Sequence, residues 1–224
     1  MKYKSRIFES LTDKVRMVAD RIQGLDFLTI AQPGDLGLES ERAHRSSPSG
    51  DKYLDNVLSY FDITHKDSII DIGCGKGSAM RTIMKLPFAR VDGIEVSEHI
   101  ADIALMNFRR LKATSSEIFV CDASEFSDYD NYNYVYMYNP FPPIVMSVVV
   151  DALINSILRV ERELIIIYNN ATCHDVIVRL GVFKQIGLYP DKWGNGISVY
   201  SNCEENNSRM SASKCSLCTF QPNH

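Results

Sequence analysis

The chain has 224 residues, of which 45% are hydrophobic and 23% charged, and its formal net charge is −4. This length predicts one domain with a sizeable core, and the composition is that of a globular protein in water. The negative charge disfavours a general nucleic-acid binder, because such proteins hold phosphates with surplus cations. A local basic patch remains compatible with it.

Neither a membrane span nor a secretion signal is predicted. The longest apolar stretch, residues 144–158, contains Asp151, and the basic start of the chain is soon interrupted by Glu9 and Asp13. The six cysteines are irregularly spaced. We therefore expect a cytoplasmic protein with reduced thiols, no membrane partner and no bound metal.

The first fifty residues predict a helix followed by a loop. In residues 5–23 an apolar side chain recurs every three or four positions, which is typical of an amphipathic helix, and Gly24 is the expected stop. The apolar positions are Ile7, Leu11, Val15, Val18 and Ile22. Residues 30–50 are rich in proline, glycine and serine. We expect them to form a loop that folds over a ligand, with a plain connector as the alternative.

A cofactor site is predicted at residues 68–78. Residues 68–72 form a short β-branched run typical of a buried strand, and Gly73, Gly75 and Gly77 follow it. Glycine lets the backbone turn sharply and pass close to a ligand, because no Cβ intervenes. Residues 78–86 then favour a helix. Strand, glycine turn and helix in this order are typical of a nucleotide-type cofactor site.

Strands and helices alternate along the rest of the chain. Further strands are expected at residues 90–96, 117–121, 132–138, 163–168, 183–188 and 197–201. Helices are expected at residues 98–111, 144–160 and 173–180, with one more, capped by Ser49 or Asp51, before the first strand. Residues 148–150 also fit a strand, but the length of the segment and Pro143 at its start favour a helix. The alternation predicts an α/β fold with a doubly wound, mainly parallel, seven-stranded sheet and helices on both faces.

The domain boundaries follow from composition. We expect a single domain over residues 1–203, with its α/β core at 51–203, and a disordered tail at 204–224, which is polar and poor in apolar residues. Cys215 and Cys218 have the spacing of half a zinc site. An incidental tail is the favoured alternative.

Polar residues end the predicted strands at the edge where parallel sheets bind ligands. Glu95 stands 22 positions after Gly73, a distance at which a carboxylate can accept both ribose hydroxyls. Asp122 can accept a hydrogen bond from the amine of adenine, although a helix cap is its ordinary role, and Asn139 ends the fourth strand. A dinucleotide fingerprint is disfavoured, because Ser78 replaces its third glycine.

These motifs resemble those of class I (seven-strand, Rossmann-like) S-adenosylmethionine-dependent methyltransferases. Residues 71–77 (DIGCGKG) are similar to the family's first motif, 93–97 (GIEVS) to the second and 121–123 (CDA) to the third. The resemblance covers residues 50–202 and implies an antiparallel last strand. It also implies S-adenosylmethionine as cofactor. The implied cofactor-binding residues are Asp71, Gly73, Gly75, Gly77, Glu95, Asp122, Ala123 and Asn139.

The segment Asn139-Pro140-Phe141-Pro142 is similar to the motif of methyltransferases that act on planar or amide nitrogens. The resemblance implies that Asn139 is catalytic, accepting an N–H of the methyl acceptor, and that Pro140 and Phe141 contact this substrate. The acceptor is unknown. A small molecule or protein is favoured, nucleic acid is not excluded, and the oligomeric state is open.

Two alternatives remain at this stage: a non-catalytic S-adenosylmethionine-binding protein and an NAD-dependent oxidoreductase. His174 is the histidine nearest a predicted strand end and a weak candidate for a general base.

Overall fold

The computed structural model describes residues 14–29, 48–113 and 116–203. Four predictions lie wholly or partly outside these residues: the first part of the N-terminal helix with Ile7 and Leu11, most of the loop at 30–50, the tail at 204–224 and its Cys215/Cys218 pair.

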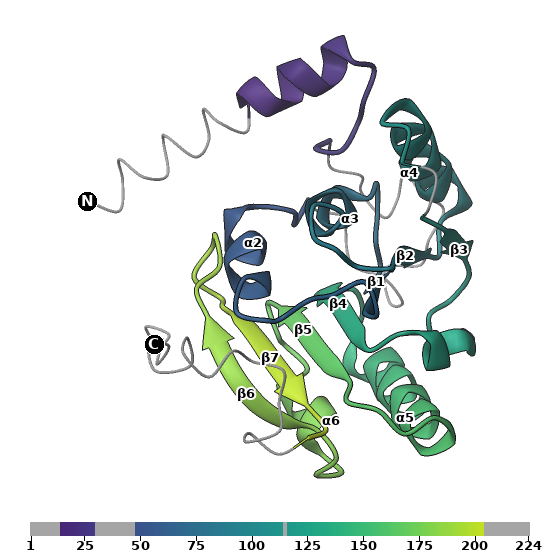
Figure 1. Cartoon of the computed structure of the whole chain (residues 1–224), viewed down its shortest axis with the longest axis vertical. Helices are drawn as coiled ribbons and strands as arrows, with labels where there is room; N and C mark the ends of the chain where they lie inside the picture. The colour runs from purple at the N-terminus through teal and green to yellow at the C-terminus, as the bar shows by residue number, and fades with distance from the viewer. Residues whose placement is uncertain (1–13, 30–47, 114–115, 204–224) are drawn as a thin grey trace.

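A single sheet of seven strands forms the centre of the molecule (Figure 1). The strands are β1 (Ser68–Ile72), β2 (Arg90–Glu95), β3 (Ile118–Val120), β4 (Tyr134–Tyr138), β5 (Ile165–Asn169), β6 (Lys184–Tyr189) and β7 (Ile197–Ser201). Their spatial order is β3-β2-β1-β4-β5-β7-β6. Strands β1 to β5 pair in parallel, whereas β7 runs antiparallel to both β5 and β6. The predicted fold, including its antiparallel last strand, is confirmed.

Helices cover both faces of the sheet (Figure 1). One layer consists of α2 (Lys52–Leu58), α3 (Ser78–Ile83) and α4 (Glu98–Arg110). The other consists of α5 (Pro143–Arg159), α6 (His174–Val178) and the short 3-10 helix η2 (Asp128–Asn131). We call the two sides of the sheet the α2 face and the α5 face. Every helix in the described part of the chain is too short or too polar to cross a membrane.

Strand alternation divides the core between these faces. Ile69 and Tyr134 pack into the cluster on the α2 face, whereas their neighbours Ile70 and Val135 pack into the cluster on the α5 face. Residues 144–160 are helical as expected, with Pro143 in the first turn, so the three valines at 148–150 do not form a strand.

One tyrosine departs from the predicted alternation. The spacing of Tyr132, Tyr134, Tyr136 and Tyr138 predicts that all four share a face. The last three do contact the cluster on the α2 face, but Tyr132 precedes the strand and packs on the α5 face. Its hydroxyl donates to Asp92 Oδ2 at 2.7 Å, and its carbonyl accepts from Arg162 Nε at 2.7 Å. These polar contacts turn it away from the tyrosine run.

The N-terminal helix presents its apolar side to solvent. Residues 14–22 are helical and the chain turns at Gly24, as predicted. However, Val15, Val18 and Ile22 are 69%, 58% and 82% exposed. The buried side instead carries Asp20, whose Oδ1 accepts from Arg81 Nη1 of α3 at 2.8 Å. An ion pair, rather than the apolar stripe, therefore orients this helix.

The strand register brings the predicted site residues to one edge. Ile72 lies beside Ile94 and Met137, and Tyr138 lies beside Asn169. The residues that follow these positions thus meet at the carboxyl ends of β1, β2, β4 and β5.

Candidate cofactor and acceptor site

The glycine turn, residues 73–77, leaves β1 in a conformation that needs its glycines. Gly73, Gly75 and Gly77 have φ angles of 74°, 54° and 85°, in the region that side chains with a Cβ rarely adopt. The N–H groups of Gly73 and Cys74 both donate to the carbonyl of Ile94, at 2.9 Å, so β2 holds the start of the turn. The turn then leads directly into α3.

Glu95 closes the far side of this turn. Its Oε2 accepts from the N–H of Gly75 and its Oε1 from the N–H of Ser97, both at 3.0 Å. Burial raises the pKa of Glu95, and these backbone donors oppose the shift. A carboxylate has about four acceptor positions, so that of Glu95 can also bind a ligand hydroxyl. The predicted link between the glycine turn and the end of β2 is present.

Asp71 places a second carboxyl group beside the first. It is 2% exposed, and its Oδ2 has no hydrogen-bond partner among the described residues. Burial and the charge of Glu95 raise the pKa of Asp71 well above its ordinary value. Tyr136 lies opposite Asp71 on β4, and Asn169, 5% exposed, ends β5. A buried carboxyl group with a free acceptor atom fits a cationic ligand group better than an anionic one.

Asp122 and Ala123 lie in the turn after β3. Asp122 Oδ1 accepts from the N–H of Ser124 at 2.9 Å and from its hydroxyl at 2.6 Å, so the carboxylate caps a turn and not a helix. Ala123 is 7% exposed, and its carbonyl accepts from the hydroxyl of Tyr129 at 3.0 Å. Their predicted contact with adenine stays a prediction.

Asn139 follows β4 with a left-handed φ of 38°, which asparagine tolerates better than most residues. Its Oδ1 accepts from Thr172 Oγ1, in the turn after β5, at 2.6 Å. This is the oxygen predicted to accept an N–H of the methyl acceptor, and it keeps one further acceptor position. Pro140 is half-buried and contacts the glycine turn, since a Cβ built on Gly73 would lie 2.9 Å from Pro140 Cβ.

Phe141 and His174 both take part in packing within the domain. Phe141 is 6% exposed and packs into the core on the α5 face, so little of its ring is open to a substrate. Its predicted substrate contact stays a prediction. His174 Nδ1 lies 2.9 Å from the hydroxyl of Tyr200, and the two rings pack 5.7 Å apart. Through these contacts the histidine packs between α6 and the sheet.

Several site residues carry no sequence signal of their own. Thr172 contacts Asn139 through a side-chain hydrogen bond, and strand pairing places Tyr136 beside Asp71 and Asn169 beside Tyr138. A polar residue at the end of β5 is the one cue that strand-end reasoning could have used for Asn169, because the same rule identified Glu95 and Asn139.

The fold and this edge define a Rossmann-like domain with a nucleotide-type cofactor site. Residues 69–163 match the family model described as a methyltransferase domain. The matched region includes the glycine turn, Glu95, Asp122 and the Asn139 segment. Residues 69–163 are therefore similar to a methyltransferase domain, and the predicted resemblance to class I S-adenosylmethionine-dependent methyltransferases is confirmed. The match favours this class over the oxidoreductase alternative.

Solved structures share the fold at low sequence identity. The PH0226 protein from Pyrococcus horikoshii OT3 superposes with a TM-score of 0.52 at 17% identity, over 66% of this chain and 87% of that one. A mutant of MtNAS in complex with S-adenosylmethionine gives 0.51 at 17% identity, over 66% of this chain and 59% of that one. CalS10, an amino pentose methyltransferase from Micromonospora echinaspora, gives 0.50 at 11%, over 67% and 88%. No curated protein sequence matches the chain.

Proposed function

We propose that this chain binds S-adenosylmethionine at the carboxyl edge of the sheet and transfers its methyl group to a nitrogen atom of a small molecule or protein. The contact between Gly73 and Pro140 carries this proposal. It joins the glycine turn, which carries the donor motif, to the segment that carries the acceptor motif. A methyl group held over the turn would then face an acceptor held at Asn139, as in-line transfer requires.

The charges of the site support this donor. S-adenosylmethionine carries a sulfonium and an ammonium group, and Asp71 and Glu95 bury two carboxyl groups at the same strand ends. Burial, and after it the charge of Glu95, raises the pKa of Asp71, and a bound cation would oppose this shift. The crystal structure of MtNAS holds S-adenosylmethionine on a similar fold, which agrees with this assignment.

The residues of the chain contribute mainly by positioning. When bound, S-adenosylmethionine supplies an electrophilic methyl group. The free acceptor position of Asn139 Oδ1 orients an N–H of the substrate, so that the nitrogen lone pair points along the line of the bond to be broken. Thr172 fixes the Asn139 side chain through its 2.6 Å hydrogen bond. The reaction forms an N–C bond, breaks an S–C bond and releases the nitrogen proton to solvent.

Calorimetry with S-adenosylmethionine and S-adenosylhomocysteine tests the donor half of the proposal. We expect binding of both, and no binding at millimolar concentration would contradict it. Transfer of a radiolabelled methyl group to a panel of amines, amides, alcohols and proteins tests the acceptor half. Cofactor binding without transfer to any of them would favour the non-catalytic alternative.

Two variants at Asn139 separate its side chain from its backbone. Asn139→Gly keeps the left-handed φ without strain, whereas Asn139→Ala removes the same amide and strains the backbone. Both should bind S-adenosylhomocysteine nearly as the parent does and transfer methyl about tenfold or more slowly, because a substrate hydrogen bond is lost. Full activity in Asn139→Gly would refute the role of the amide.

We also infer a reducing, cytoplasmic location. Cys74, Cys121 and Cys173, three cysteines of the described residues, are free thiols. Alkylation of protein from intact cells would detect them, and oxidised thiols would contradict the inference.

A further inference from the structure

Lys76 belongs to the glycine turn, but its side chain binds a different segment of the chain. It is 8% exposed, and its Nζ donates to Asp26 Oδ2 at 2.6 Å and to Thr29 Oγ1. Asp26 lies 50 positions earlier in the chain. We call residues 25–29 the strap. Burial acts to raise the pKa of Asp26, but the hydrogen bonds from Lys76 and Thr29 lower it overall, which agrees with a charged pair.

Asn107 of α4 binds both the strap and the glycine turn. Its Oδ1 accepts from the N–H of Asp26 at 2.8 Å, and its Nδ2 donates to the carbonyl of Asp26 at 2.9 Å. The same Nδ2 donates to the carbonyl of Lys76 at 3.1 Å. Asn107 is 1% exposed, so these bonds form away from water. One amide thus fixes the backbone of the strap against the backbone of the glycine turn.

Apolar contacts hold the strap on either side of this polar junction. Leu25 and Phe27 flank Asp26 and are 3% and 2% exposed. The ring of Phe27 lies 5.9 Å from that of Phe108, and Phe108 in turn fills the space where a Cβ of Gly77 would stand. The aromatic packing therefore connects the strap with Gly77, the last glycine of the turn, and the hydrogen bonds connect the strap with Lys76.

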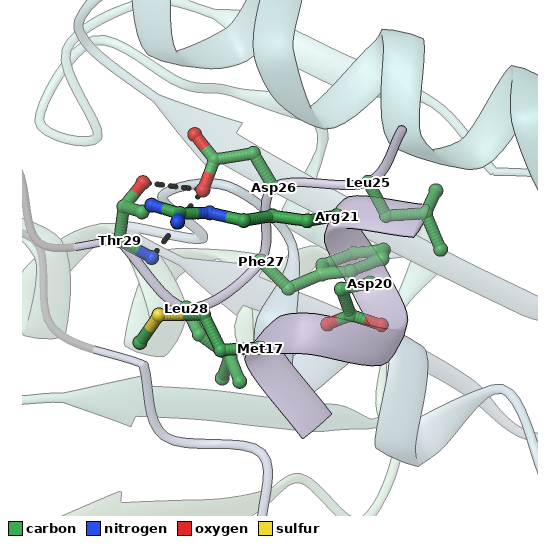
Figure 2. A pocket seen from close by; sticks show the side chains of 8 residues that line it. All are labelled: Met17, Asp20, Arg21, Leu25, Asp26, Phe27, Leu28 and Thr29. Atoms are coloured by element: carbon green, nitrogen blue, oxygen red, sulfur yellow. Dashed lines mark hydrogen bonds between the residues drawn. The ribbon is translucent and has the colours of Figure 1, made fainter. Parts of the chain in front are cut away.

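On its other side the strap borders a hollow. A cavity of about 260 Å³ lies between the strap and Met17, Asp20 and Arg21 of the N-terminal helix (Figure 2). Figure 2 shows the hydrogen bonds from Thr29 to Asp26 within the strap, and Arg21 lines the same cavity. Because a cavity lies on this side of the strap, the contacts with α4 and the glycine turn provide much of the packing that keeps the strap in place.

We propose that the strap is a positioning element for the cofactor site, acting through the Asp26–Lys76 ion pair and the Asn107 junction on the conformation of the glycine turn. The inference rests on the proposed function, since the turn is taken to hold S-adenosylmethionine. The strap lies outside residues 69–163, the region matched by the methyltransferase family model. By reciprocity, a ligand that binds the ordered turn also stabilises the docked strap.

The test compares two ion pairs of the same N-terminal segment. Asp26→Asn and Lys76→Met each break the pair that reaches the glycine turn, and the double variant removes both partners. Asp20→Asn is the matched control, because Asp20 pairs with Arg81 of α3, outside the turn. Calorimetry gives the affinity for S-adenosylhomocysteine, and urea unfolding gives the stability of each variant.

We expect each single variant at the Asp26–Lys76 pair to bind S-adenosylhomocysteine about tenfold more weakly, and the double variant to bind no more weakly than the worse single one. Asp20→Asn should lose stability and keep its affinity within about twofold. Affinity losses equal to those of Asp20→Asn would show that the strap only supports folding. That result would overturn the inference and leave the proposed function intact.

Hydrogen exchange on the parent provides a second test that needs no variant. Saturating S-adenosylhomocysteine should slow amide exchange at residues 25–29, although the ligand site lies at the strand ends. Unchanged exchange in the strap, with protection of the glycine turn, would overturn the inference alone. A parent that binds neither S-adenosylmethionine nor S-adenosylhomocysteine would overturn both proposals.

Discussion

Replacing Gly73 with alanine probes the contact between the two halves of the site. The φ of 74° costs an alanine about 1–2 kcal/mol. The new Cβ would also lie 2.9 Å from Pro140 Cβ, closer than two carbons can approach, and neither the proline ring nor the turn is a flexible chain end. Overpacking of this kind costs a further ~1–3 kcal/mol. We therefore expect Gly73→Ala to lose about 2–5 kcal/mol of folding free energy.

Gly181→Ala provides the matched control. Gly181 has a similar φ of 67°, but no heavy atom of the described residues lies within 4 Å of a Cβ added there. Urea unfolding should show a loss of only about 1–2 kcal/mol, with S-adenosylhomocysteine affinity unchanged by calorimetry. Gly73→Ala should also bind the ligand at least about tenfold more weakly, because the turn must move away from Pro140. Equal stability and affinity in the two variants would refute the tight contact between Gly73 and Pro140.

Three further substitutions test the electrostatics and shape of the site. Glu95→Gln should lower stability by about 1–3 kcal/mol and weaken ligand binding, because an amide cannot accept from both the Gly75 and Ser97 N–H groups. An unchanged free energy of unfolding would contradict these hydrogen bonds. Asp71→Asn should remove a dependence of the folding free energy on pH. Because the pKa of Asp71 is raised in the folded protein, the parent loses stability relative to the variant as pH rises above the ordinary value of 3.8. The loss is at most about 1.4 kcal/mol per pH unit. Parallel stability curves against pH would show that Asp71 keeps an ordinary pKa. Gly75→Arg should abolish cofactor binding by filling the site, and measurable affinity in calorimetry would place the ligand elsewhere.

The order of strands and helices could be predicted from the sequence because its signals are local. β-Branched runs at residues 68–72 and 165–167, the glycines at 73, 75 and 77, and Pro143 each restrict the backbone through their own side chains or lack of one. Parallel pairing then requires the strand ends to meet, and this requirement placed Glu95 beside the glycine turn.

The sites of side-chain contact were harder to predict. The apolar spacing of Val15, Val18 and Ile22 indicated an amphipathic helix but not that Asp20 would face the domain. Phe141 stands in a motif that implies substrate contact, and the motif did not indicate that its ring packs into the core on the α5 face. Each outcome depends on a partner far away in the sequence, which local propensity does not encode.

The sequence by itself determined the glycine turn and the acidic residue that closes it, since backbone sterics and strand periodicity need no distant partner. Only the tertiary structure decided what surrounds that turn. Lys76 lies within the motif, but its partners Asp26 and Asn107 come from 50 positions before it and 31 after it. Folding brings these segments together because Leu25 and Phe27 must be buried, and the polar junction then forms where water is excluded.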